Sequence, residues 1–554
     1  MIRPFLGKYK PWTCTPVQPD YVHWVASGTL GINRTLAAVG GINSCHYRCF
    51  HRDPTAPFPD FAVTFRKWTE FWNVTRPNCE FLEVKCGPYY RDFFFQIVPR
   101  RKSDEAPETL SVVVLVLDSL SHSSFIRNFP ETLKLLQFRY NAVILNGYSR
   151  VGSNSYSNGL PILADMSPWT KEEGHYLRFP NGSERFHDDY PLIWKKFQDK
   201  FGGVTLLQED EPKWNLFTQS TTGFFRQPTD HLFRPLLVAF ENSQLFTKSS
   251  QFCLGNRPIY EAMFRYFEEF LRAYRRQQKF ALFWLAEPLH YDWVSGSQIE
   301  TEMLKLLERI RPLLNNTVFF LMSDHGHKFD DIRKTPVGRL ESDLPFFSLT
   351  LPDWLRRKYP RIVENLKSNA DRLTSHFDTY ATLLDILNFD SWTQDFSEQI
   401  NAGNKGLSLF RPISENRTCS QALIPLERCP CVNSKEIPTK DETVNSAAHA
   451  LVGTINEKLF RYKEMCAVLE LNETLSAEKL GITESTNGLN SFNTLHFRVI
   501  IRTTPSQGIF EAILCQNENG HFSVVGTISR TNRYGSQARC MPDPRIKEFC
   551  YCLS

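Results

Sequence analysis

Two apolar runs of the chain each end in an aspartate. Leu110–Asp118 reads LSVVVLVLD and Thr317–Asp324 reads TVFFLMSD, with His325 and a glycine following directly. Together a carboxylate and an imidazole offer a hard oxygen ligand and a nitrogen ligand, and the glycine permits an immediate turn. These two ends predict a divalent-metal site with Asp118, Asp324 and His325 as ligands. The competing interpretation of Asp118 is a helix N-cap, which is a common role of aspartate.

A third segment, Tyr148–Leu163, carries a serine suited to nucleophilic attack. It reads YSRVGSNSYSNGLPIL, a turn of small polar residues that continues into a predicted helix. Backbone N–H groups and the dipole at a helix start favour an anion such as phosphate. A metal ion beside a serine lowers the cost of forming the alkoxide. We therefore predict Ser155 as a nucleophile, with a simple N-cap role as the alternative.

Alternating strand and helix patterns position these segments. Further apolar runs, typical of strands buried on both faces, cover Gly202–Gln208, Phe280–Glu287 and Leu344–Pro352. Apolar residues recur at helical spacing in Tyr260–Arg276, Gln298–Leu314 and Asp378–Leu387. This alternation predicts an α/β fold with a mostly parallel sheet that helices cover on both faces. In such sheets, sites form at the carboxyl ends of the strands.

The two ends of the chain differ from this centre. Residues 1–104 are rich in aromatic residues and cysteine and predict a Cys-rich N-terminal module, with a polar linker at Pro99–Thr109. Residues 105–420 form the predicted catalytic domain. Residues 421–554 predict a Cys-rich α+β appendage, with a helix near Val444–Leu459 and strands in HFRVIIRT and IFEAILC.

Cysteines and glycosylation acceptors indicate the compartment. The chain has 14 cysteines, an even number, at irregular spacings that favour disulfides over a zinc ribbon. N-x-S/T acceptor triplets begin at Asn33, Asn73, Asn181, Asn315, Asn416 and Asn472. We therefore predict a glycoprotein of the extracellular space or the secretory-pathway lumen. A cytosolic protein with many free thiols is the alternative.

Charge and hydropathy constrain the partners. A formal net charge of +4 argues against nucleic acid, which usually needs a concentrated basic face. The N-terminal residues have no apolar signal core, and the chain has no run of about 18 apolar residues. We expect the chain start to be incomplete or misassigned, with a removed targeting segment as the alternative. Any membrane association would then need a segment absent from this chain.

The segments together resemble the alkaline phosphatase superfamily in its sulfatase-like branch. They resemble still more closely the DUF229 family of animal ectodomain proteins. The stretches that carry the resemblance span roughly residues 105–390 and read VLVLDSLSHSSFIRNFPET, GYSRVGSNSYSNGLP, PTDHLFRP, FLMSDHGHKFDDIR, GRLESDLPFFSLTLPDW and LTSHFDTYATLLDIL.

The resemblance implies an alkaline-phosphatase-like fold and a set of roles. Asp118, Asp324 and His325 match metal ligands, and Ser155 falls where the superfamily has its nucleophile. For a second site or leaving-group assistance the candidates are three histidines: His290, His327 and His376. The implied cofactor is one or two divalent ions (zinc, manganese or magnesium). The implied reaction is hydrolysis or transfer of a phosphate-type ester.

The chain also departs from the family pattern. Ser155 is followed by Ser157 and Gly159, where formylglycine-forming sulfatases need a proline and an arginine, so sulfate ester hydrolysis is disfavoured. The acid usual four residues before the second-site histidine is Ala286 here, with Glu287 one place off. A one-metal site like that of lipoteichoic acid synthases is compatible with this change. The alternative function is a secreted or membrane-associated, catalytically inactive binding protein that holds a glycan or protein partner.

Two further sets of charged residues allow two interpretations each. Glu209 and Asp210 follow an apolar run and could face the cleft, but we expect a solvated acidic turn. Arg127 and Arg150 could hold a substrate anion or lie on the surface.

Overall fold

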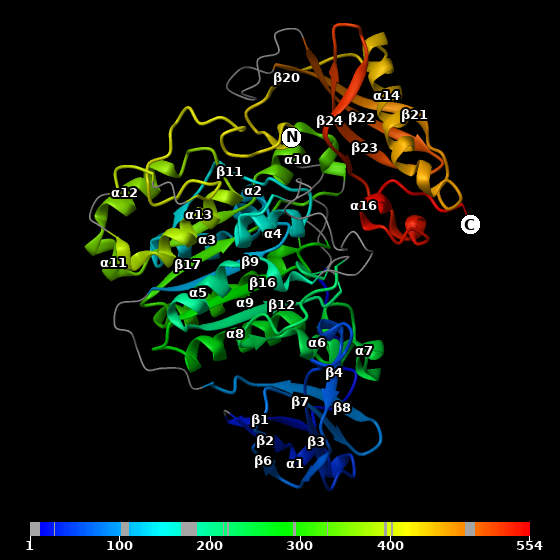
Figure 1. Cartoon of the computed structure of the whole chain (residues 1–554). Helices are drawn as coiled ribbons and strands as arrows, with labels where there is room; N and C mark the ends of the chain where they lie inside the picture. The colour runs from blue at the N-terminus through cyan, green and yellow to red at the C-terminus, as the bar shows by residue number, and fades with distance from the viewer. Residues whose placement is uncertain are drawn as a thin grey trace.

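The computed structural model describes residues 11–553 except 27, 101–109, 168–185, 214, 219–220, 292–294, 330, 393–395, 400–402 and 482–493. Most of the predicted linker and the acceptor triplet at Asn181 lie outside the described residues. The remaining elements fall into a central α/β part with a β-rich segment before it and an α+β segment after it (Figure 1). The exact domain boundaries stay a prediction.

A seven-stranded sheet forms the centre, in the order β10-β18-β17-β9-β16-β12-β13. Its strands are β9 (Ser111–Leu117), β10 (Val143–Ile144), β12 (Val204–Glu209), β13 (His231–Leu232), β16 (Lys279–Leu285), β17 (Thr317–Met322) and β18 (Phe347–Thr350). The five strands from β17 to β13 are parallel, whereas β18 and β10 pair antiparallel at one edge. The predicted mostly parallel α/β sheet is therefore confirmed, and the run from Leu344 supplies an antiparallel strand of it.

Helices bury both faces of this sheet. Side chains of β9 alternate between two apolar cores, with Val113 and Leu115 on one face and Val112 and Val114 on the other. The first face is covered by α2 (His122–Asn128), α3 (Pro130–Phe138), α6 (Arg234–Glu241), α8 (Ile259–Ala273) and α9 (Gly296–Ile310). The second is covered by α4 (Ser155–Ala164), α5 (Ile193–Phe201), α11 (Asp353–Lys358), α12 (Pro360–Asn369) and α13 (His376–Leu387). This double burial explains why the strands read as continuous apolar runs.

The N-terminal segment is a small β structure that packs on the first face. Its elements are β1 (Val22–Ala26), β2 (Thr29–Ile32), α1 (Arg34–Val39), β3 (Cys45–Arg52), β4 (Val63–Phe65), β5 (Thr69–Phe71), β6 (Val74–Thr75), β7 (Phe81–Cys86) and β8 (Tyr90–Phe95). Phe50, Phe81 and Phe93 belong to the same apolar core as β9. The aromatic residues of this segment therefore hold it against the central domain.

The C-terminal segment is a five-stranded antiparallel sheet with a helix across it (Figure 1). Its elements are β20 (Asn433–Glu436), α14 (Glu442–Leu459), β21 (Glu470–Gly481), β22 (Leu495–Thr504), β23 (Ile509–Gln516) and β24 (Phe522–Arg530). Apolar residues of α14, such as Leu451 and Ile455, pack against Val499 and Phe510 of the sheet. The predicted α+β character is confirmed.

Twelve of the cysteines pair. The disulfides are Cys14–Cys253, Cys45–Cys86, Cys49–Cys79, Cys419–Cys429, Cys466–Cys550 and Cys540–Cys552. Such bonds are characteristic of an oxidising compartment, which confirms the disulfide prediction and contradicts the alternative with many free thiols. Within the described ranges, no helix has both the length and the apolar character needed to span a bilayer.

Candidate metal centre and nucleophile

Adjacent parallel strands bring the two predicted acids together. Asp118 directly follows β9, Asp324 lies two residues beyond β17, and the two strands pair in parallel register. One ligand atom each of Asp118, Asp324 and His325 lies within 4.8 Å of the others. Each of the three residues is at most 2% exposed. Because Ser121 caps α2, the N-cap interpretation of Asp118 is wrong.

Neutral donors hold both carboxylates. Asp118 Oδ1 accepts the Ser119 hydroxyl at 2.8 Å, and its Oδ2 accepts Ser155 Oγ at 2.8 Å and Trp284 Nε1 at 2.9 Å. Asp324 Oδ1 accepts the Ser119 backbone N–H at 3.2 Å. Among the described residues, neither acid forms an ion pair with a lysine or arginine. Two buried carboxylates therefore lie close together without a directly paired lysine or arginine, which is costly.

The orientation of His325 completes this picture. Its Nδ1–H donates to the Gly326 carbonyl at 2.9 Å, so the lone pair of Nε2 faces the acids. Nε2 lies 3.3 Å from Asp324 Oδ2 and 3.9 Å from Asp118 Oδ1. Both His325 Nε2 and Asp324 Oδ2 are buried without a hydrogen-bond partner. Such a set of acceptor atoms fits a divalent cation, and a donation from the other ring nitrogen to a carbonyl is usual for metal-binding histidines.

Electrostatics agree with the geometry. Burial, and then the charge of Asp118, raises the pKa of Asp324 well above its usual range. Burial, together with the nearby cations Lys328 and Arg150, lowers the pKa of His325. The first shift reflects two close carboxylates in a buried site, and the second favours the neutral form of the His325 ring.

A close backbone approach requires the glycine after His325. A Cβ atom on Gly326 would lie 1.7 Å from the carbonyl oxygen of Glu341, at the far side of the β17–β18 connection. The Gly326 N–H donates to the Ser342 carbonyl at 2.9 Å. The predicted immediate turn is therefore present, and it fixes the direction of the His325 ring.

Ser155 lies at the first turn of α4 with its hydroxyl directed at Asp118. Asn154, and not Ser155, is the N-cap: its side chain accepts the Ser157 N–H, and the Ser157 hydroxyl accepts the Asn154 N–H. The N-cap interpretation of Ser155 is therefore wrong. Because Asn154 takes the capping role, the Ser155 hydroxyl is available to bond with Asp118.

The three remaining candidate histidines have different surroundings. His376 begins α13 and stacks on Tyr148, and its Nε2 donates to the main-chain carbonyl of Asp324 at 2.6 Å. His376 therefore contacts the main chain of Asp324 and lies outside the cluster of Asp118, Asp324 and His325. His290 is exposed and close enough to Asp118 for their charges to interact. His327 is buried, with its ring 6.4 Å from that of Phe329.

The C-terminal segment reaches the loops that carry two of these histidines. Arg533 donates to the Tyr291 carbonyl, next to His290. Its guanidinium also lies over the rings of Tyr291 and Phe329, at 5.6 and 5.7 Å. Residues more than 200 positions apart in sequence thus border the same region.

The sequence did not reveal two hydrogen-bond donors to Asp118, and it suggested the wrong surroundings for two other acids. Ser119, in the left-handed region at φ 61°, and Trp284 on β16 both bond Asp118, and neither belongs to a motif that signals this role. Glu209 and Asp210 are buried, so the solvated acidic turn was wrong. Asp210 accepts the N–H groups of Ala286 and Glu287 and so holds the loop before His290.

The two arginines that could hold an anion or lie on the surface are engaged in ion pairs. Arg127 forms two bonds with Glu341, at 2.7 and 3.0 Å. Arg150 is 1% exposed and bonds Asp343 through Nε at 2.8 Å. Lys328 is half-buried and interacts electrostatically with both acids. Burial and then Arg150 lower its pKa to about 8, against the attraction of Asp118 and Asp324.

Comparisons with solved structures find low-identity likenesses. The C-terminal periplasmic domain of EcEptC from Escherichia coli, in complex with Zn, is 14% identical over 56% of this chain and 88% of that one, with a TM-score of 0.37. The lipoteichoic acid synthase LtaP from Listeria monocytogenes is 11% identical over 80% of this chain and 90% of that one, with a TM-score of 0.35. The phosphonate monoester hydrolase SpPMH from Silicibacter pomeroyi is 10% identical over 75% and 90%, with a TM-score of 0.38.

The sequence comparisons address the family directly. A search of curated proteins gives no match. The family model described as "Protein of unknown function (DUF229)" matches residues 18–475, which is most of the chain and includes every candidate site residue. The predicted family is confirmed, and the chain belongs to the DUF229 proteins.

Proposed function

We propose that this protein is a metal-dependent hydrolase or transferase of a phosphate-type ester with Ser155 as its nucleophile. One observation carries the proposal: the buried, unpartnered atoms His325 Nε2 and Asp324 Oδ2 face each other beside Asp118. The Ser155 hydroxyl bonds that same Asp118. The proposed nucleophile and the proposed metal ligands therefore share the carboxylate of Asp118.

The residues of the chain divide the work. Asp118, Asp324 and His325 would hold the ion; mixed oxygen and nitrogen ligands are compatible with zinc, manganese or magnesium. When bound, such an ion supplies charge for the ester oxygens and lowers the cost of forming the serine alkoxide.

Asp118 Oδ2 orients Ser155 Oγ and accepts its proton as Oγ attacks phosphorus in line. Trp284 fixes the orientation of that carboxylate through its indole N–H. We assign to His290, near Asp118, assistance to the leaving group through a hydrogen bond from its ring N–H, because its pKa is lowered to about 4 and the neutral ring is favoured. His376, which bonds the Asp324 main chain, positions this acid; a direct ligand role for it stays a prediction.

The test combines metal content with turnover. Purified protein is measured for bound zinc, manganese and magnesium, and then assayed on an aryl phosphate, a bis-aryl phosphodiester and an aryl sulfate. We expect a stoichiometric metal and turnover of a phosphate ester, lost in Ser155→Ala although the metal is retained. Ser153→Ala, in the same turn, is the matched control.

Other outcomes would refute the assignment. A folded protein that takes up no divalent metal would instead support a binding function for the scaffold. Turnover of the aryl sulfate alone would make the protein a sulfatase, against the absence of the proline and arginine that formylglycine formation needs.

A further inference from the structure

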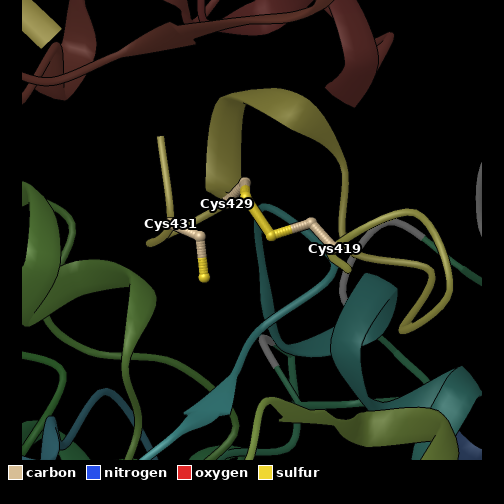
Figure 2. Close-up of side chains that lie close together, drawn as sticks. All are labelled: Cys419, Cys429 and Cys431. Atoms are coloured by element: carbon tan, nitrogen blue, oxygen red, sulfur yellow. A yellow bond between two sulfur atoms is a disulfide. The ribbon is translucent and has the colours of Figure 1, made fainter. Parts of the chain in front are cut away.

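A free thiol lies against a disulfide outside the candidate metal centre. Cys419 and Cys429 are bonded, Cys431 is unpaired and exposed, and all three sulfur atoms lie within 4.8 Å of one another. Figure 2 shows the Cys431 side chain beside the bond between the other two. Only Pro430 separates Cys429 from Cys431.

The other free cysteine is too far away to be the partner of Cys431. Cys515 lies on β23, and the sheet order places β21 and β22 between β23 and β20, the strand that follows Cys431. In register, Ser434 opposes Leu480, which opposes His496, which opposes Cys515. Three strand spacings separate Ser434 from Cys515 by about 14 Å, well beyond the reach of a disulfide, and Cys431 lies three residues before Ser434. The reaction partner within reach of the Cys431 thiol is therefore the adjacent Cys419–Cys429 disulfide.

The loop closed by this disulfide packs against the nucleophile turn. Cys419 and Cys429 share a small apolar core with Val151, four residues before Ser155, and with Phe377, next to His376. Arg428, adjacent to Cys429, bonds Ser529 at 2.8 Å and lies 3.9 Å from Asp343. A change in which of these sulfurs are bonded would therefore disturb the packing around Val151, in the turn that leads to Ser155.

We propose that Cys419, Cys429 and Cys431 form a thiol–disulfide exchange site. The Cys431 thiolate attacks Cys419 Sγ, a Cys419–Cys431 bond forms, and the Cys419–Cys429 bond breaks. Cys429 leaves as the thiolate and takes up the proton that Cys431 lost, so no outside oxidant or reductant is consumed. Attack on Cys429 instead would close a bond across a single proline of fixed φ, which is the less favourable product.

The exchange has a defined structural consequence. Bonding Cys431 to Cys419 shifts the bonded position by two residues, a chain displacement of up to about 7 Å. Arg428 would then be drawn away from Ser529 and Asp343. Asp343 also accepts a hydrogen bond from Arg150, which lies five residues before Ser155. Loss of the Arg428 contact would therefore alter the surroundings of the segment that carries Ser155.

Disulfide mapping tests the proposal without reference to turnover. Native full-chain protein is incubated in mildly alkaline buffer, because partial burial raises the pKa of the Cys431 thiol and thiolate must form. Samples are quenched with acid, alkylated with a maleimide and digested without reduction for mass spectrometry. We expect alkylation to begin on Cys431 and to appear over time on Cys429, together with a Cys419–Cys431 linked peptide.

Two variants make the result decisive. Cys431→Ser should keep Cys419–Cys429 as the sole pairing of these positions, whereas Cys515→Ser, the other free thiol, should exchange like the wild type. The proposal fails if Cys431 remains the alkylated residue while Cys429 never becomes so. It also fails if the main product is a dimer linked through Cys431. Since sulfur connectivity is read directly, either failure leaves the proposed metal chemistry untouched.

Discussion

Two clusters of buried acids in this molecule are compensated in different ways. At the metal centre, Asp118 and Asp324 receive bonds from neutral serine and tryptophan donors. At the junction between the β17–β18 connection and the C-terminal sheet, Asp343, Glu478 and Glu511 each form ion pairs with arginine. We call this second group the junction cluster; it comprises Asp343, Glu478, Glu511, Arg150, Arg333, Arg339, Arg428 and Arg498.

The pKa values of one buried acid in each cluster, Glu511 and Asp324, move in opposite directions. Burial raises the pKa of Glu511, but Arg333, Arg498 and Arg339 outweigh it and the net shift is downward. At the metal centre, burial and Asp118 both raise the pKa of Asp324. Both carboxylates are buried, but the charge of Glu511 is balanced by arginines whereas that of Asp324 has no paired lysine or arginine. The protein supplies arginine partners at the junction, whereas the proposed function assigns the missing ion-pair partner at the centre to a metal ion.

The largest expected effect comes from removing a charge at the centre. Asp324→Asn should abolish metal retention and lower turnover by more than about 100-fold, since loss of an outer partner alone costs up to that much. Elemental analysis and the aryl phosphate assay measure both. Glu511→Gln is the contrast: it should keep its metal, and a loss of metal there would show that the two clusters are not separate.

At the junction, the expected loss is in stability. Glu511→Ala leaves Arg333 and neighbouring guanidiniums buried without their acid, which should cost about 3–5 kcal/mol in the free energy of unfolding. Glu473→Ala, which breaks an exposed pair with Arg502, should cost at most about 1 kcal/mol. Urea denaturation of both variants checks this. Equal costs would mean that burial does not distinguish the two pairs.

A smaller effect should follow from loss of a neutral donor. Trp284→Phe keeps the ring but removes the N–H that bonds Asp118, so metal affinity should fall by about 10–100-fold with the fold intact. Competition with a chelator measures it. Trp354→Phe, whose indole N–H bonds Asn316 away from the site, is the matched control and should bind metal like the wild type.

The smallest effect concerns acid stability. Because the folded pKa of Glu511 is lowered, the unfolded state binds its proton at higher pH than the folded state does. Its contribution is therefore present above the unfolded value, about 4.3, and is lost as pH falls through the folded value. Urea midpoints measured over an acidic pH series should fall more steeply for the wild type than for Glu511→Gln. Parallel slopes would contradict the arginine compensation.

The sequence alone located the strand ends of the site. The runs before Asp118 and Asp324 are apolar on both faces because helices cover both sides of the sheet, and that pattern is local. The turn after His325 and the helix after Ser155 were equally readable, because glycine and small polar residues act on their immediate neighbours. The sequence also indicated that the cysteines would be paired, though not which ones pair.

Only the tertiary structure decided which atoms meet. Trp284 bonds Asp118 because β16 lies beside β9. His376, which the sequence suggested as a metal ligand, instead donates a hydrogen bond to the main-chain carbonyl of Asp324. The pairing of Cys419 with Cys429, and the arginines that meet Glu511, join segments with no local signal for each other. Hydrogen bonds and ion pairs depend on distances and directions set by sheet register and packing, and residue order does not contain these.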